Sequence, residues 1–590
     1  MMVISNLLRL EADWVIIDMH DFGLKEGPEH DNAIAVYWGL KACRNEPGAV
    51  LRFPQGTYHF RPEKATERFL YITNHDQGGT RRIAFPIAGF EGLTIDGQGS
   101  AFIFHGPMIP FLVEGSKGVT LKNVTVDWER PMFDQGTVAA VGDDWFDIRL
   151  RDGVEHEFRD NRLFFRFGGR MEPVWGLHDI DPATMAHAYG SGDRISWSSF
   201  ARLSMEQAAP GVARVTGPIR HMPKEGHLIA MRFGRRENPG VFLKDSEDIR
   251  IERVTVHHAP GMGLVAQRCA DIALERFDVK LRERSGRVVT ATADAVHFTN
   301  CRGAIVIEHC LFENQLDDPC NVHGIYSGIV ERLSDRTVLV RYLESMTIGI
   351  GVAEPGDTMR FVRRESLLGY AEGVVDDVSP INGTFVAVTF KEPLPDTIGE
   401  GDVLENATWN ADLTVRHCTV RANRARGFLI TTPGKVLLES NTISAPGAGI
   451  KISGDANSWY ESGAVRDVTI RGNVFLDCNT CPDWGRAVID IDPEIEEPER
   501  FDCYHRNIRI EDNTFRTFDT GLVYGRSVDG FTFRRNTIER PRHYPARGTQ
   551  KHAIELTAAR NVDIADNVCA DGPGTALVGT DEYPIGGGKR

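Results

Sequence analysis

Short runs of alternating apolar and polar residues recur along the chain and are its main structural signal. Each run is followed by a polar break, a second run, and then an asparagine or another small polar residue. Examples are LKNVTVDW (121–128), IERVTVHH (251–258), VRHCTVRA (415–422), LESNTISA (438–445) and IEDNTFRT (510–517). A period of two is typical of β-strands, and the 3.6-residue period of amphipathic helices is missing from these runs. The pattern therefore predicts an all-β protein.

The spacing of the asparagines sets the length of the repeating unit. Asn441, Asn473, Asn513, Asn536 and Asn567 are 32, 40, 23 and 31 residues apart. A unit of about 23 residues cannot bury a core alone, so successive units must stack, which predicts a parallel β-helix filled by Val, Ile, Leu and Phe. Each Asn is expected at a turn, with left-handed φ and hydrogen bonds to the Asn above and below. A leucine-rich horseshoe has a similar period, but its L-x-x-L-x-L-x-x-N signature is absent.

The N-terminal part predicts a cap for this solenoid. Residues 31–45 (DNAIAVYWGLKACRN) form an amphipathic helical pattern and precede the strand-like LRFPQGTYHF. This arrangement resembles the N-terminal cap of the pectate-lyase-like superfamily of right-handed β-helices, in which the cap covers an exposed sheet edge.

Two stretches break the repeat with alternating strands separated by Gly, Pro and Asp, which predicts two inserted small β-barrels. The two barrels are expected to flank the functional site on the face of the solenoid. The predicted division is 1–132 for the cap and first coils, 133–236 for one barrel, 237–324 for coils with the candidate chemistry, 325–405 for the other barrel, and 406–590 for the C-terminal coils.

Charge and composition argue against several classes of function. With 83 Asp and Glu against 67 Lys and Arg, the net charge is −16, which disfavours a nucleic-acid binder. No apolar stretch approaches the roughly 18 residues needed to span a bilayer, so no membrane partner is expected. The N-terminus carries no secretion signal, so the chain is expected to be cytoplasmic or to lack a leader in this numbering. Cys478 and Cys481 form a C-x-x-C without a second ligand pair, which favours buried thiols over a zinc site.

Aligning the coils places two acidic residues at equivalent positions. TAD precedes AVHF, LDD precedes PCNVHG and RAR precedes GFLIT, so Asp294 and Asp318 fall one turn apart (318 − 294 = 24), with Asp317 beside them. Adjacent strands are about 4.8 Å apart, and stacked acids repel, so fold stability gives no reason for this placement. Such a cluster can divide into proton donor and acceptor. A calcium site and an ordinary solvated turn are the alternatives.

Long motifs around these aspartates resemble glycoside hydrolase family 110, the α-1,3-galactosidases. They are ATADAVHFTNCRGAIVIEHCLFENQLDDPCNVHGIY (291–326), DWERP (127–131), HHAPGMGLVAQR (257–268), GFLITTPGKVLLE (427–439) and GDANSWYESGAV (454–465). The resemblance implies a right-handed β-helix that removes terminal α-1,3-linked galactose, as in the blood-group B determinant or linear Galα1-3Gal, with inversion at the anomeric carbon. No G-x-x-x-x-G-K-S/T, G-x-S-x-G or H-E-x-x-H motif occurs, so no metal or organic cofactor is expected. The resemblance and the projecting barrels together favour a homodimer.

The resemblance implies that Asp294, Asp317 and Asp318 are catalytic. By analogy with the similar β-helical polygalacturonases, Asp317 is expected to be the acid, and Asp294 and Asp318 are expected to hold the attacking water. Candidates for sugar binding are His297, Asn321, His323, Arg426, Asp455, Trp459 and Glu461.

Several of these candidates have structural alternatives. The histidines could be satisfied residues inside the coils, Trp459 could belong to the core, and Arg426 could simply neutralise the acidic cluster. Trp128, Glu129 and Arg130 could line the pocket or only anchor the first barrel.

Three other functions remain open from the residues alone. A polysaccharide lyase would need a basic groove or Ca²⁺ to neutralise a uronate, which an acidic chain fits less well. A polygalacturonase-like hydrolase would use a similar aspartate trio. A carbohydrate-binding adhesin would need no carboxylates in register.

Overall fold

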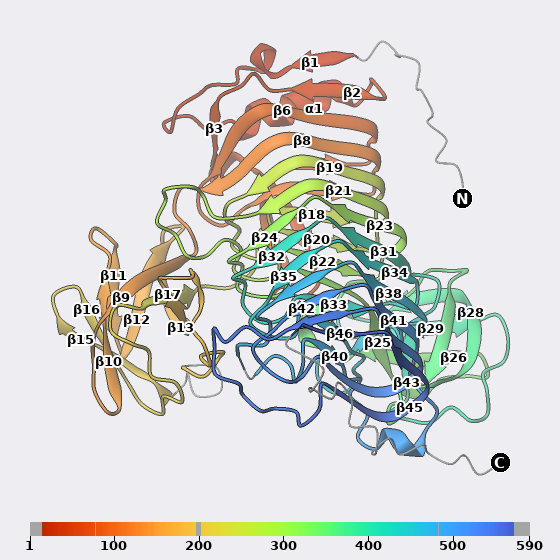
Figure 1. Ribbon diagram of the computed structural model, residues 1–590. Helices are drawn as coiled ribbons and strands as arrows, with labels where there is room; N and C mark the ends of the chain where they lie inside the picture. Colours follow the sequence, from red (N-terminus) through yellow and green to blue (C-terminus); the bar gives the residue numbers. More distant parts are fainter. Residues whose placement is uncertain (1–14, 77, 196–201, 482, 571–590) are drawn as a thin grey trace.

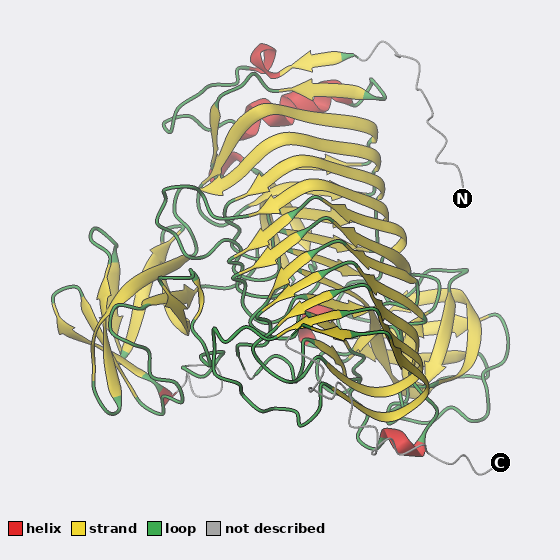
Figure 2. Ribbon diagram, in the orientation of Figure 1, coloured by secondary structure: helices red, strands yellow, loops and turns green. Residues whose placement is uncertain are grey.

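The computed structural model describes residues 15–76, 78–195, 202–481 and 483–570. Strands stack along one axis as a long solenoid, and two groups of antiparallel strands project from it on different sides (Figures 1 and 2). None of the helices among the described residues is long and apolar enough to cross a bilayer.

Three parallel sheets form the solenoid, because each strand pairs with its equivalent in the next coil. The first contains β5 (Gly79–Ala88), β7 (Ile109–Glu114), β18 (Val241–Lys244), β20 (Leu264–Gln267), β22 (Val296–Thr299), β25 (Cys320–Arg332), β33 (Phe428–Thr431), β36 (Ile450–Ile452), β40 (Ile489–Ile491), β43 (Val523–Arg534) and β45 (Ile554–Ala565).

The second and third sheets share several long strands that bend between them. The second contains β1 (Ile16–Asp18), β2 (Ala49–Arg52), β6 (Glu91–Phe104), β8 (Lys117–Trp128), β19 (Glu247–Val256), β21 (Ala270–Val279), β23 (Arg302–Glu308), β31 (Ala411–Arg416), β34 (Lys435–Glu439), β38 (Asp467–Arg471) and β41 (His505–Glu511), and it ends on β43 and β45. The third continues through β6, β8, β19 and β21, and adds β3 (Thr57–Phe60), β24 (Leu311–Glu313), β32 (Thr419–Arg421), β35 (Thr442–Ser444), β39 (Val474–Leu476), β42 (Thr514–Arg516), β44 (Thr537–Glu539) and β46 (Val568–Cys569).

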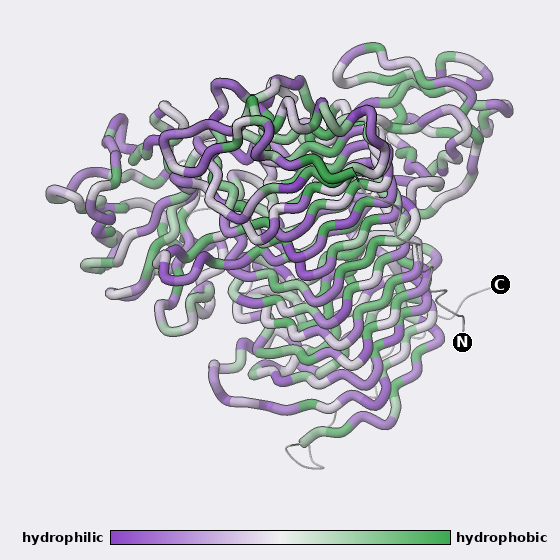
Figure 3. The backbone as a smooth tube through the Cα atoms, turned by 90° about the horizontal axis from the view of Figure 1, so that it is seen from above, coloured by the Kyte–Doolittle hydropathy of each residue, from purple (hydrophilic) through white to green (hydrophobic). Residues whose placement is uncertain are grey.

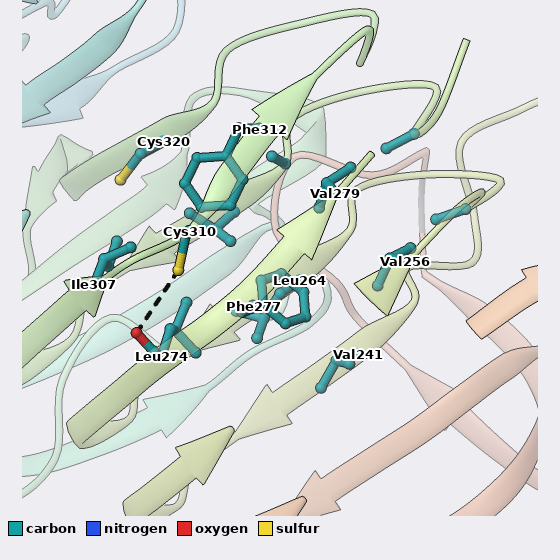
Figure 4. Close-up of a cluster of buried hydrophobic side chains, with 14 of the residues drawn as sticks. Val241, Val256, Leu264, Leu274, Phe277, Val279, Ile307, Cys310, Phe312 and Cys320 are labelled. Carbon is teal, nitrogen blue, oxygen red and sulfur yellow. Dashed lines mark hydrogen bonds between the residues drawn. The ribbon is translucent and has the colours of Figure 1, made fainter. Parts of the chain in front are cut away.

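Apolar side chains from all three sheets fill the interior. Alternating strand residues point inward, so hydrophobic positions line up in rows across successive coils (Figure 3). Figure 4 shows part of this core, where Leu274, Phe277 and Val279 of β21 lie beside Ile307 and Phe312 of the following coil. Because no coil encloses its own side chains, each depends on its neighbours for burial.

The asparagines form the predicted ladder of buried amides. The backbone N–H and side-chain Nδ2 of Asn441 donate to Oδ1 of Asn473, at 2.9 and 3.0 Å, and the same pair of bonds joins Asn473 to Asn513. The ladder continues to Asn536 and Asn567. The expected left-handed φ at these asparagines is wrong. The residues that adopt it, with φ between 53 and 63°, come directly before them, namely Ser440, Gly472, Asp512, Arg535 and Asp566. The preceding residue makes the bend, which leaves the Asn side chain directed along the ladder.

Helix α1 (Ala33–Cys43) lies at the N-terminal end of the stack (Figure 1). It packs on β2 and β5 through a buried face that includes Val36, Leu40 and Cys43, while Trp38 is exposed. The neighbouring strand β4 (Thr66–Leu70) pairs antiparallel with β5.

The first insertion is an antiparallel, nearly closed sheet. Its strands are ordered β11 (His156–Arg159), β12 (Arg162–Phe167), β13 (Arg170–Asp181), β17 (Leu228–Phe233), β9 (Phe133–Val141), β10 (Trp145–Leu150), β16 (Val212–Thr216) and β15 (Ser204–Ala209), with β14 (Ala186–His187) paired to β13. One backbone bond, from the Met205 N–H to the Asn161 carbonyl, links the two ends of this order.

The second insertion is a closed ring of six strands. It runs β25, β26 (Thr337–Tyr342), β29 (Phe385–Phe390), β28 (Gly369–Pro380), β27 (Thr358–Val362) and β30 (Val403–Asn406), then back to β25. Strand β25 belongs to both bodies, because residues 320–323 pair with the solenoid and residues 326–332 pair with the ring. The ring therefore begins inside a solenoid strand, without an intervening loop.

Candidate active site

The three aspartates lie on the loops that precede β22 and β25. Val296 pairs with Cys320 in register, so Asp294 and Asp318, two residues earlier on each strand, occupy equivalent positions on neighbouring coils. The Ala295 N–H donates to the Asp318 carbonyl at 2.9 Å, which extends the pairing into the loops. The stacking that the spacing predicts is confirmed.

All three carboxylates line one cavity of about 250 Å³. Five of the predicted sugar-binding residues also line it, namely Asn321, Arg426, Asp455, Trp459 and Glu461. The three acids differ in burial. The exposed fraction of the Asp317 side chain is 19%, against 6% for Asp294 and 2% for Asp318. Asp317 is therefore the acid that solvent or a bound ligand reaches most easily.

Arg426 holds Asp318 through both of its oxygens. Arg426 lies one coil beyond Asp318, because Cys320 pairs with Phe428. Its Nη2 donates to Oδ2 at 2.7 Å, its Nε donates at 3.2 Å, and its backbone N–H donates to Oδ1 at 2.9 Å. This bidentate geometry fixes the orientation of the carboxylate and neutralises part of the acidic cluster.

Asp294 is held from below by two buried histidines. His297 Nδ1 lies 2.7 Å from Asp294 Oδ2, and His297 Nε2 lies 2.9 Å from His323 Nε2. His323 Nδ1 in turn lies 2.7 Å from the Gly324 carbonyl. Neither ring lines the cavity, so the expectation that these histidines bind sugar is wrong. Strands β22 and β25 are buried on both faces, which places the rings beneath the carboxylate, where they orient it.

Burial and mutual repulsion perturb the acid–base behaviour of this cluster. Burial raises the pKa of Asp294 well above its ordinary value, and the charge of Asp317 raises it further. Burial also raises the pKa of Asp318, an effect that the Arg426 charge opposes without cancelling. Burial lowers the pKa of His297 to about 3, so this ring is neutral. Paired acids with displaced pKa values are the arrangement that general acid–base catalysis uses.

Glu461 and Asn321 form one polar wall of the cavity. The short strand β37 (Glu461–Ser462) pairs with residues 324–325 of β25, which brings Glu461 beside the aspartate coils. Asn321 Nδ2 donates to Glu461 Oε1 at 3.1 Å, and Glu461 Oε1 is also 3.6 Å from His323 Nε2. Asn321 Oδ1 is buried without a partner in the part of the chain that the structure describes.

The loop of residues 455–460 also lines the cavity, through Asp455, Ser458 and Trp459. Asp455 accepts hydrogen bonds from the backbone N–H groups of residues 457–460, so its carboxylate organises the loop as well as lining the cavity. Trp459 is 45% exposed, so it is not a core residue. It lines this cavity and an adjoining one, where an aromatic face suits the apolar face of a sugar.

The residues at the start of the first insertion anchor it and do not line this cavity. Trp128 is fully buried, and its Nε1 donates to the Gly106 carbonyl at 3.0 Å. Arg130 pairs with the buried Asp134 at 2.8 Å, and Glu129 and Arg130 line a separate cleft. Cys478 and Cys481 are buried free thiols.

The sequence did not indicate several other polar and charged residues of the site. Asn74, Arg236, Lys451, Asp492 and Glu494 also line the cavity. Arg424 contacts Asp317, with Nη1 at 3.1 Å from Oδ1, and Arg236 lies 3.9 Å from Oδ2. Arg424 belongs to the RAR triplet (424–426) that aligns with LDD (316–318), so the alignment of the coils could have indicated that it lies near the aspartates. Arg236 and Asn74 come from distant parts of the chain and carry no local pattern. Within the described residues, no group of three or more His, Cys, Asp or Glu is arranged to hold a metal ion.

The stacked coils and the acidic cavity define a parallel β-helix protein whose site lies on the solenoid beside the first insertion. The chain matches three family models, namely "GLAA-B beta-barrel domain I" at residues 134–229, "GLAA-B beta-barrel domain II" at 337–404, and "Right handed beta helix region" at 403–584.

Bacterial relatives match nearly the whole chain. It is 35% identical over 94% of its length to α-1,3-galactosidase B of Bacteroides thetaiotaomicron, covering 90% of that protein. It is 34% identical over 95% of its length to α-1,3-galactosidase A of Shewanella woodyi, covering 91% of that protein. The chain belongs to the α-1,3-galactosidase family. Among solved structures, an exopolygalacturonase from Thermotoga maritima matches with a TM-score of 0.40 and 10% identity, over 93% of this chain and 91% of that one.

Proposed function

We propose that this chain is an exo-acting, inverting α-1,3-galactosidase that releases terminal α-1,3-linked galactose from blood-group B type or linear Galα1-3Gal glycans. The observation that carries the proposal is the convergence of Asp294, Asp317 and Asp318 on one cavity, in a chain whose relatives bear this name over almost its whole length. A glycoside hydrolase needs such a set of carboxyl groups, one to protonate the leaving oxygen and one to activate water.

Asp317 is the proposed acid. It is the most accessible of the three, and it also lines a second, adjoining cavity of about 650 Å³ that has room for the rest of the glycan. Its carboxyl proton passes to the glycosidic oxygen as the bond from that oxygen to C1 breaks, and the oxygen keeps the bonding electrons. The leaving saccharide then departs as an alcohol through the second cavity.

Asp294 and Asp318 are the proposed pair that holds and deprotonates the attacking water. The water oxygen bonds to C1 from the face opposite the leaving group, and one of its protons passes to this pair, so the anomeric configuration inverts. Burial raises the pKa of both carboxyls, while the Arg426 charge favours the ionised form of Asp318, which is the form that takes a proton from water. Arg426 and His297 hold the two groups in place.

The remaining walls suit a single neutral sugar. Asn321, Lys451 and Glu461 offer hydrogen-bond donors and acceptors, and the exposed ring of Trp459 offers a stacking surface. A homodimer and a capping role for α1 stay predictions.

Incubation with three substrates separates the candidate functions. Galα1-3Gal and the blood-group B trisaccharide are expected to release galactose, first seen by anomer-resolved NMR as the β-anomer. A rise in ultraviolet absorbance on pectin would support a lyase, new reducing ends on pectin would support a polygalacturonase, and no reaction with any substrate would support an adhesin.

Substitution of the acid tests the assignment within the site. Asp317→Asn is expected to abolish hydrolysis of Galα1-3Gal while retaining slow hydrolysis of an aryl galactoside whose phenolate leaves without protonation. Asp248→Asn, at a solenoid position whose side chain is half-exposed and lines neither cavity, is the control. Equal losses on both substrates would contradict the acid role of Asp317.

A further inference from the structure

We infer that Asp193, from the first insertion, is a positioning residue that acts through Arg424 to let Asp317 serve as the acid. This inference rests on the proposed function. It makes the insertion part of the reaction machinery, although Asp193 lies 124 residues before Asp317 (317 − 193 = 124) and on a different body.

The guanidinium of Arg424 bridges the two carboxylates. Its Nε donates to Asp193 Oδ1 at 2.9 Å and its Nη2 donates to Asp193 Oδ2, which is a bidentate pair. Its remaining nitrogen, Nη1, lies 3.1 Å from Asp317 Oδ1. One arginine therefore gives two hydrogen-bonding nitrogens to Asp193 and one to Asp317.

The bridge is buried and held from both sides. The exposed fractions are 6% for the Arg424 side chain and 12% for Asp193. The ring centroid of Trp484 lies 5.0 Å from Cζ of Arg424. The Trp484 Nε1 donates to Asp193 Oδ2 at 3.2 Å. In so buried a setting an ion pair acts strongly on its neighbours, because little water screens it.

The loop that carries Asp193 is docked on the solenoid. The Gly190 N–H donates to the Thr480 carbonyl at 3.0 Å, and the Asp193 N–H donates to Asp483 Oδ2 at 3.3 Å. Arg194 pairs with Asp483 at 3.3 Å. These contacts fix where the insertion places the Asp193 carboxylate.

The positive charge of Arg424 explains why this arginine must bind a second carboxylate besides Asp317. An arginine paired only with Asp317 would stabilise the ionised form of that carboxylate and hold back the proton that an acid must donate. Asp193 accepts hydrogen bonds from two of the three guanidinium nitrogens of Arg424, so it offsets most of this positive charge. Burial raises the pKa of Asp193, but the charge and the hydrogen bonds of Arg424 together outweigh it and keep this pKa low, so Asp193 remains the anion of the pair.

Other charged groups face Asp317 as well, and the inference takes them as a fixed background. They are Arg232 and Arg236 from the end of the first insertion, Arg426 from the coil above, and Asp294, Asp318 and His297 from the aspartate coils. Arg424 is distinct among them because it is the arginine within hydrogen-bond distance of Asp317 and of a carboxylate from the insertion.

The test compares Asp193→Asn with Asp147→Asn. Asp147 is a matched control, since it is also a buried carboxylate of the first insertion that binds an arginine, Arg214, through two bonds of 2.8 Å, but it does not line either cavity of the site. For Asp193→Asn, kcat on Galα1-3Gal is expected to fall about 10- to 100-fold, a part of what a general acid contributes. KM should change less than about twofold, because the change weakens the acid and leaves sugar contacts intact.

Two further readouts distinguish a role in proton donation from a merely structural one. Loss of Asp193 leaves Arg424 to Asp317 alone, so the alkaline limb of the kcat profile should move to lower pH. An aryl galactoside with a good leaving group should lose much less activity than the disaccharide. Asp193→Glu, which keeps the charge, should recover part of the loss, and Asp193→Ser, which also removes the charge, replaces Asp193→Asn if the latter does not fold.

The possible outcomes separate this inference from the proposed function. A wild-type chain that releases no galactose overturns both. An active wild type with Asp193→Asn indistinguishable from Asp147→Asn in kcat and pH profile overturns the role of Asp193 alone. Equal loss on both substrates, with an unmoved pH profile, also overturns it, because that result indicates general damage to the fold.

Discussion

Replacing Arg426 with Gln tests how the buried base is kept ionised. Arg426 reaches both oxygens of Asp318, whose side chain is only 2% exposed. Removing one partner of a buried ion pair costs roughly 3–5 kcal/mol, because the other charge stays buried and uncompensated. One pKa unit corresponds to about 1.4 kcal/mol, so proton uptake by Asp318 would relieve this cost through a rise of about two to four units.

We expect a shift near the lower end of that range. The backbone N–H at 2.9 Å remains as a donor after the substitution, and the Gln side chain supplies an amide. A base must be ionised to act, so the acid limb of the kcat/KM profile should move up by about two pH units. Below the new limb, kcat/KM should fall about tenfold for each unit of pH.

The assay is a kcat/KM profile on Galα1-3Gal from acidic to alkaline pH. Arg421→Gln is the matched control, since Arg421 pairs with Glu313 at 2.7 Å on a neighbouring strand but is 59% exposed. This control should keep the wild-type profile. An Arg426→Gln profile that is lower at every pH but unmoved along the pH axis would refute the reasoning, because Arg426 would then act on sugar binding alone.

Three further outcomes follow from the fold and the cavity. Asn513→Ala should lower the free energy of unfolding by about 2–4 kcal/mol in a denaturant titration, because two buried N–H donors of Asn473 lose their acceptor. Asn45→Ala, at an exposed position, should change this free energy little. Trp459→Ala should raise KM about tenfold with a smaller change in kcat, and Trp38→Ala, equally exposed on α1, should change neither. Burial lowers the pKa of His297, His258 and His75 to about 3 in the folded chain, whereas these rings bind a proton near pH 6.5 in the unfolded chain. The free energy of unfolding, measured by denaturant titration, should therefore be full above pH 6.5 and decline as the pH falls toward 3. A free energy of unfolding that stays constant across this window would contradict the burial of these rings in the neutral form.

The solenoid could be predicted from sequence because its strand pairing is local in the repeat. Alternating residues give the strands, and the asparagine spacing gives the coil. Once one strand is aligned, parallel pairing carries the register to the next coil, which is why the positions of Asp294, Asp318 and Arg426 could be placed in advance. The φ angles of the asparagines could not be predicted. Which residue makes the bend depends on where the Asn side chain meets the Asn of the next coil, and this position is known only from the folded structure.

The roles of the residues around the acids were harder to predict. His297 and His323 alternate with apolar residues as outward positions would, yet both are buried, because residues 461–462 and the loop around Thr73 cover that face of β22 and β25. Asp193 and Arg236 come from the first insertion, where only the fold brings them to the solenoid. A sequence pattern records neighbours along the chain, so it could not reveal pairs that form across two bodies.

The two insertions differ in how they reach the site, and this difference bears on their functions. The second continues directly from β25, where pairing with the ring begins at Tyr326, three residues after His323, so it is tied directly to the aspartate coils. The first reaches the site through a docked loop and through Arg236 just beyond β17, and both deliver charge to the side of Asp317. The solenoid thus sets the spacing of the acids, whereas the first insertion sets the charge around the acid that faces the leaving group. Substitutions in that loop should therefore change rates more for poor leaving groups than for good ones, while substitutions beneath Asp294 should affect both equally.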